Sequence, residues 1–119
     1  MATIRAFTTI EQSRKLTYIL PLESADMCWK NEVFDKYIQC FTPFVIDEDG
    51  TNVDFDYDIP CWSLAALLNV LPNGIVMNKD SQNGKYHFSS EYIGTYVTAD
   101  NPVDACVAMV EKLHELNLL

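Results

Sequence analysis

The chain has 119 residues, and its 8 Lys and Arg stand against 17 Asp and Glu, which gives a formal net charge of −9. The length suffices for one domain, and a hydrophobic fraction of 49% is typical of a globular rather than a disordered chain. The negative charge argues against direct binding to nucleic acid, which requires clustered Lys and Arg. No apolar run approaches the roughly 20 residues that cross a bilayer, so we expect no membrane contact.

The cysteines predict a reducing compartment. Cys28, Cys40, Cys61 and Cys106 are spaced too widely for a CxxC motif or a zinc knuckle. Residues 1–11 contain no apolar segment of the kind found in secretory signals. We therefore expect a cytoplasmic protein whose thiols are reduced and mostly buried.

The first predicted element is a helix over residues 8–20. Thr8 and Glu11 match a capping box, in which the N-cap hydroxyl accepts a hydrogen bond from a backbone amide and the N3 side chain bonds back to the cap. Pro21 should end the helix, because proline disrupts helical hydrogen bonding.

The next segment is harder to interpret. Residues 22–46 are rich in aromatic and β-branched side chains, which predicts one or two strands, or a strand and a short helix. Residues 47–50 predict a turn, and a hairpin around it would pair 45–46 with 53–57. Within 53–57 apolar and acidic residues alternate, so one face of this strand would be apolar and the other acidic.

A core helix is predicted over residues 60–71. Nearly every side chain between Pro60 and Pro72 is apolar, so this helix should be covered on most of its surface. Pro60 suits the first helical turn, and Pro72 should end the helix.

The last third of the chain predicts a meander followed by a helix. Three short strands are expected at 75–78, 85–91 and 95–99, with turns at 80–84 and 92–94. A helix over 101–117 should follow, since an Asn cap precedes Pro and an apolar stripe with helical spacing.

These elements predict the fold class. Helical and β segments are separated, without regular βαβ alternation, which favours an α+β fold. We expect a single domain over residues 1–119, with an antiparallel sheet packed by about three helices.

Signals for catalysis are weak. His87 and His114 are the only histidines, and neither a GxSxG nor an HExxH motif is present. The four glycines are too far apart to form a phosphate-binding loop. We therefore expect a non-enzymatic protein with no catalytic residue, no metal ligand and no cofactor; a Cys–His pair formed only in three dimensions remains the alternative.

The most distinctive feature is an acidic stretch. Six acidic residues lie within residues 37–78, a segment without Lys or Arg. They are Asp47, Glu48, Asp49, Asp54, Asp56 and Asp58. They either keep an exposed hairpin edge from pairing, or form a docking surface for a basic protein partner, whose binding would weaken with salt. An EF-hand loop is excluded, because placing Gly50 at the sixth position puts Val45 where the first carboxylate is needed.

Several segments resemble a known group of proteins. The segments are 20–27, 59–72, 101–107 and 112–116, and together they are similar to small uncharacterised proteins of gut Bacteroidales and of their phages and prophages. The resemblance implies a cytoplasmic, phage-encoded context and transfers no catalytic residue.

Two functions of different classes follow. The first is a small acidic binding protein, such as a phage or mobile-element accessory factor, that engages a host protein through the acidic residues. The second is a protein that binds and sequesters a small molecule or nucleotide signal, since 12% of the residues are aromatic and could line a sheet surface. A homodimer through the apolar C-terminal residues Leu116, Leu118 and Leu119 is a further possibility.

Overall fold

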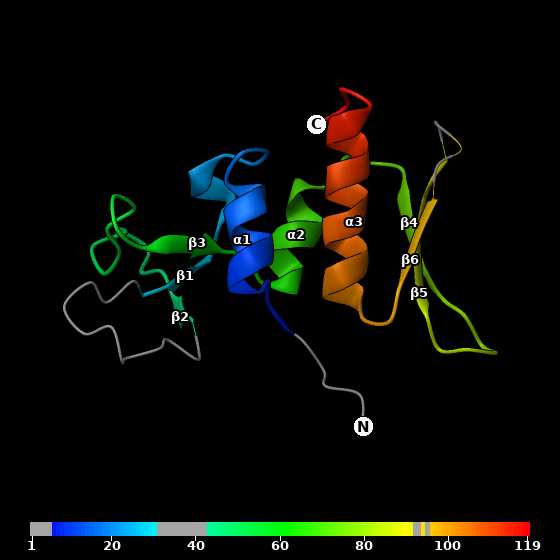
Figure 1. The fold of residues 1–119 in the computed structure, drawn as a ribbon, viewed down its shortest axis with the longest axis horizontal. Coiled ribbons are helices and arrows are strands. Elements are labelled where there is room, and N and C mark those ends of the chain that lie inside the picture. Colours follow the sequence, from blue (N-terminus) through cyan, green and yellow to red (C-terminus); the bar gives the residue numbers. More distant parts are fainter. Residues whose placement is uncertain (1–5, 31–42, 92–93, 95) are drawn as a thin grey trace.

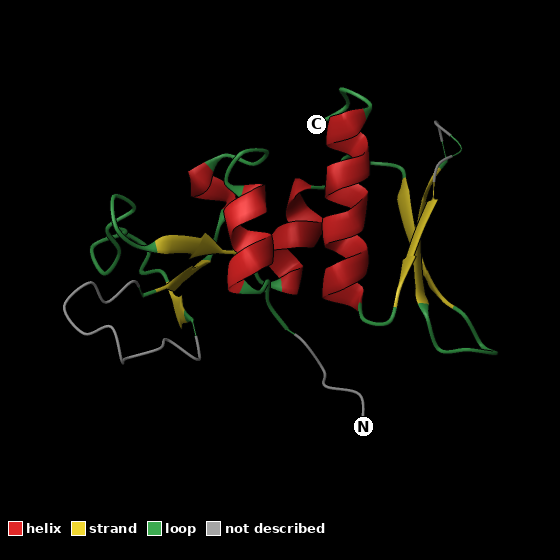
Figure 2. Cartoon of the chain, viewed as in Figure 1, coloured by secondary structure: helices red, strands yellow, loops and turns green. Residues whose placement is uncertain are grey.

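The computed structural model describes residues 6–30, 43–91, 94 and 96–119 (Figure 1). Within these residues the fold is α+β, as predicted, with three α-helices and two antiparallel sheets of three strands each. The helices lie between the two sheets, and each sheet occupies one end of the molecule (Figure 2). The expected single sheet is therefore divided in two.

The first sheet has the strand order β2-β1-β3. Its strands are β1 (Met27–Trp29), β2 (Phe44–Val45) and β3 (Ile59–Cys61). Met27 lies opposite Val45 on one side and Cys61 on the other. Residues 31–42, which include Cys40, are outside the described part of the chain. The strand or helix predicted within this part of residues 22–46 is therefore not tested by the structure.

The second sheet is the predicted meander, in the order β4-β5-β6. Its strands are β4 (Ile75–Lys79), β5 (Tyr86–Ser90) and β6 (Tyr96–Ala99), close to the expected ranges. The predicted turn at 92–94 lies mostly outside the described residues.

Helix α1 (Ile10–Leu16) begins two residues after the predicted start at 8 and ends four residues before the predicted end at 20, so Pro21 does not end it. Its capping box uses Thr9, whose hydroxyl accepts from Gln12 N, while Gln12 Oε1 accepts from Thr9 N. The predicted cap, Thr8, is buried and bonds instead to Ser13 Oγ and to Trp62 N. The hydroxyl of Thr8 is thus used in tertiary hydrogen bonds, and Thr9 with Gln12 forms the capping box instead. Pro21 then begins a 3-10 turn, η1 (Leu22–Ser24).

The hairpin predicted around 47–50 is wrong. Val45 pairs with β1, and residues 53–57 form no strand. Instead the amides of Tyr57 and Asp58 both donate to the carbonyl of Asp54, which folds this segment into a turn. The alternation of apolar and acidic residues is present, but local hydrogen bonds at Asp54 replace the pairing of strands.

Helix α2 (Leu64–Val70) starts four residues after the predicted position. Pro60 lies in β3, at the edge of its sheet, where a missing amide donor is tolerated. Ser63 is the N-cap, and its hydroxyl accepts from Ala66 N at 3.2 Å. The helix ends before Leu71, whose extended backbone suits a residue that precedes proline.

Helix α3 (Pro102–Glu115) confirms the last prediction. Asn101 is the cap, and its side chain accepts from Asp104 N at 2.9 Å. α3 packs against β5 and β6 on one side and against α2 on the other (Figure 1).

The main core is built around α3. Its fully buried large side chains include Trp62, Leu67 of α2, Phe88 of β5, and Met109 and Leu113 of α3. The β2-β1-β3 sheet lies outside this cluster, at the other side of α1. No described helix has the length and apolar character of a membrane span.

Candidate functional site

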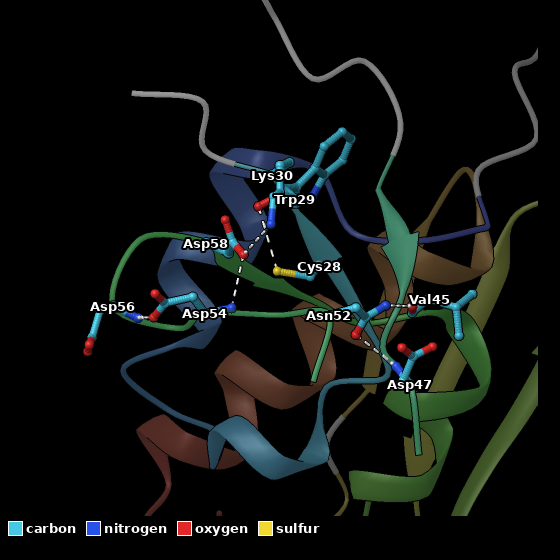
Figure 3. A network of polar contacts seen from close by, with 9 residues as sticks. All are labelled: Cys28, Trp29, Lys30, Val45, Asp47, Asn52, Asp54, Asp56 and Asp58. Carbon is cyan, nitrogen blue, oxygen red and sulfur yellow. Dashed lines mark hydrogen bonds and ion pairs between the residues drawn. The ribbon is translucent and has the colours of Figure 1, made fainter. Parts of the chain in front are cut away.

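The acidic residues lie on two successive turns beside the β2-β1-β3 sheet (Figure 3). Five of the six are exposed: Asp47, Glu48, Asp49, Asp54 and Asp56. In Figure 3, Asp54 and Asp56 lie on the opposite side of Asn52 from Asp47. The structure thus places the exposed carboxylates in two groups rather than on one strand face.

Asp58 differs from the other five because it is buried, with 6% of its surface exposed. Its Oδ2 atom lies 3.2 Å from Lys30 Nζ and accepts from Asp54 N at 3.0 Å (Figure 3). Lys30 in turn lies over the Phe44 ring, 5.4 Å from its centroid. Asp58 therefore joins the turn to the sheet. Because it is buried, only the other five acidic residues of the stretch can contribute to an exposed acidic surface.

The first turn is held by its own polar groups. Asn52 accepts from Asp47 N and donates to the carbonyl of Val45, both at 2.9 Å. Asp49 accepts from the Thr51 hydroxyl and amide, and these bonds lower its pKa, which keeps the carboxylate charged. The turn therefore presents its carboxylates in a defined arrangement.

A groove opens between this turn and η1. It is an open depression of about 490 Å³. Its apolar lining comprises Leu22, Ala25, Val45, Ile46, Val53 and Phe55, and its acidic lining comprises Glu23, Asp26, Asp47, Glu48 and Asp49. Asp54 and Asp56 are not part of it.

Sequence reasoning missed two of these carboxylates, Glu23 and Asp26. They precede the acidic stretch by more than twenty residues and reach the groove because β1 pairs with β2. The bond from Ile46 N to the carbonyl of Asp26 fixes this approach at 3.0 Å. No local pattern in the sequence could have indicated it.

The carboxylates of the groove are not equivalent. Asp26 accepts from Ser63 N and Ser63 Oγ, so it supports the start of α2. Within the part of the chain that the structure describes, no Lys, Arg or His lies within ion-pair distance of Glu23, Asp47 or Glu48. These three side chains carry negative charge that an external cation could neutralise.

The described cysteines are poor candidates for nucleophiles. The side chains of Cys28, Cys61 and Cys106 are buried. Burial raises the pKa of Cys61 and raises that of Cys106 to about 12, so both thiols stay protonated at neutral pH. His114 contacts the carbonyl of Leu119 through Nδ1 at 3.0 Å.

Comparison with known proteins identifies no relative. No family model matches the chain, and neither a curated protein nor a solved structure is significantly similar to it. The resemblance to Bacteroidales and phage proteins therefore stays a prediction.

Proposed function

We propose that this chain is a non-enzymatic binding module whose acidic groove takes a basic segment of a partner protein. The observation that supports it most directly is that one depression combines apolar side chains with carboxylates, three of which have no cation within ion-pair distance among the described residues. Lys and Arg side chains match such a site, because their aliphatic stems cover apolar surface while their charged ends reach carboxylates. We place this function in the cytoplasm, in the phage-related context that the resemblance implies.

Of the five carboxylates that line the groove, three have no cation within ion-pair distance among the described residues. Glu23 comes from η1, whereas Asp47 and Glu48 come from the turn after β2. Attraction between these carboxylates and a basic partner accelerates association, and salt weakens this attraction, because at physiological ionic strength exposed charges more than about 8 Å apart are largely screened. We therefore expect fast, salt-sensitive binding.

The apolar part of the groove adds selectivity. Val45 is 68% exposed on the edge strand β2, and Leu22 is 40% exposed on η1. A partner with apolar residues between its basic ones would cover this surface, whereas a purely basic polymer would not. The preferred partner is therefore an amphipathic basic segment.

A labelled peptide that alternates Lys and Leu tests the proposal by fluorescence anisotropy. Asp47→Lys with Glu48→Lys should weaken binding by about tenfold or more, equivalent to ~1.4 kcal/mol or more. The control is Glu91→Lys with Glu115→Lys, which changes the net charge equally at exposed positions outside the groove and should leave binding unchanged. Equal weakening by both pairs would show that net charge, not the groove, attracts the peptide.

A second comparison separates the groove from the acidic stretch. Glu23→Lys lies outside the stretch but inside the groove, and it should weaken binding. Asp56→Lys lies inside the stretch but outside the groove, and it should have a smaller effect. The reverse order would contradict the groove as the binding site.

A further inference from the structure

A row of polar side chains crosses the face of the β4-β5-β6 sheet that points away from α3. His87 of β5 lies opposite Asn78 of β4 and Thr98 of β6. Side chains alternate between the two faces of a strand, and the neighbouring Phe88 belongs to the core packed by α3. His87 and Thr98 therefore face outward, next to the β4–β5 turn that contains Asp80.

The imidazole of His87 is held on one side. Its Nδ1 atom lies 2.8 Å from Thr98 Oγ1. When Nδ1 carries the proton of the neutral imidazole and donates to this hydroxyl, Nε2 offers a lone pair on the side of the ring away from Thr98. A hydrogen bond at the second ring nitrogen is the usual support of a metal-binding histidine.

The carboxylate of Asp80 is held in the same way. Its Oδ1 atom accepts from Gln82 N at 2.7 Å and from Asn83 N at 3.3 Å. These two amide bonds fix the orientation of the carboxylate. Oδ2 is left directed toward His87.

Asp80 Oδ2 and His87 Nε2 are 3.5 Å apart. This exceeds the roughly 2.7–3.2 Å of a good hydrogen bond. It matches two ligands of one tetrahedral ion, because metal bonds of about 2.0–2.2 Å place the ligand atoms ~3.3–3.5 Å from each other. Both side chains line an open depression of about 600 Å³ together with Asn78, which leaves room for water on an ion.

We propose that Asp80 and His87 form a binding site for a divalent transition metal ion such as zinc, with Thr98 as the positioning residue of the imidazole. The site supplies two protein ligands, and no group of three or more His, Cys, Asp or Glu side chains in the described ranges could hold a metal. Water or an added ligand completes the coordination, so the ion is exchangeable and is held by fewer protein ligands than the three or four of catalytic and structural zinc sites.

Zinc titration of the full chain by calorimetry tests this site. The Cys40→Ser background removes the one thiol that lies outside the described residues. We expect one zinc ion per chain, reversed by a chelator, with the ¹⁵N resonance of His87 Nε2 shifting on addition. His87→Gln and Asp80→Asn should each lower the affinity tenfold or more, and Thr98→Val by about tenfold, the effect typical of lost support to a ligand.

His114→Gln is the matched control, since it removes the other histidine and should leave zinc binding unchanged. The side chains of Asp80, His87, Thr98 and His114 are at least partly exposed, and circular dichroism verifies that each variant folds. The proposal is overturned if the chain binds no zinc, or if binding survives His87→Gln or is lost equally in His114→Gln. The peptide assay is independent of this result, because the acidic groove belongs to the sheet at the other end of the molecule.

Discussion

Asp56 and Asp58 are two residues apart, yet their surroundings are opposite. Asp56 is exposed, whereas Asp58 is buried and bonded to Lys30 and to the amide of Asp54. Lys30 comes from the end of β1 and reaches Asp58 only because β1 pairs with β3. A sequence pattern of alternating carboxylates therefore contains both surface charge and a structural anchor.

At the residue scale, this difference predicts unequal costs of substitution. Asp58→Ala leaves the partly buried amide of Asp54 without its acceptor and Lys30 without this partner, which should lower the free energy of unfolding by about 1–3 kcal/mol. Asp56→Ala, the matched control, should change it by about 0.5 kcal/mol or less, as is usual for exposed sites. Urea unfolding measures both, and equal effects would contradict the anchoring role of Asp58.

At the element scale, the helix caps show how far local patterns reach. The cap of α3 is where the sequence indicated, because Asn101 and Asp104, three residues apart, bond to one another. The cap of α2 lies three residues after Pro60, because residues 59–61 pair with β1 before the helix begins. Local chemistry locates a cap only where no strand competes for the same residues.

Ser63 joins two elements, which makes its replacement informative. Its hydroxyl accepts from Ala66 N and donates to Asp26, so Ser63→Ala removes the cap of α2 and one of the two hydrogen bonds that join Ser63 to Asp26. The expected loss of unfolding free energy is about 1–2 kcal/mol. Thermal unfolding tests it against Ser81→Ala, an exposed turn serine that should be neutral; a neutral Ser63→Ala would mean that Asp26 and solvent replace the cap.

At the scale of the whole molecule, the helices separate two different ends. The acidic groove lies with the β2-β1-β3 sheet, and the Asp80–His87 pair lies with the β4-β5-β6 sheet (Figure 1). The ends are nevertheless connected, because β3 leads into Trp62, the largest fully buried side chain of the core. Trp62 N also donates to Thr8 Oγ1, which ties the segment before α1 to the same point.

This connection predicts that the molecule unfolds as one unit. Trp29 reports on the acidic end and Trp62 on the core. Trp62→Phe leaves only the fluorescence of Trp29, and Trp29→Phe leaves only that of Trp62. In each variant, the denaturant transition followed by tryptophan fluorescence should coincide with the loss of helix followed by far-UV circular dichroism. A fluorescence transition of Trp29 at lower denaturant than the loss of helix would show that the acidic end unfolds separately.

The sequence by itself determined the fold class, the meander and α3, because these depend on periodicity, caps and turns that act within a few residues. It also located the acidic stretch, but not which carboxylates share a surface. That was decided by the pairing of β1 with β2 and β3, which brings Glu23 and Asp26 to the groove and Lys30 to Asp58. The physical reason is that hydrogen bonds between strands join residues far apart in the chain, and neither charge nor periodicity records which distant segments will pair.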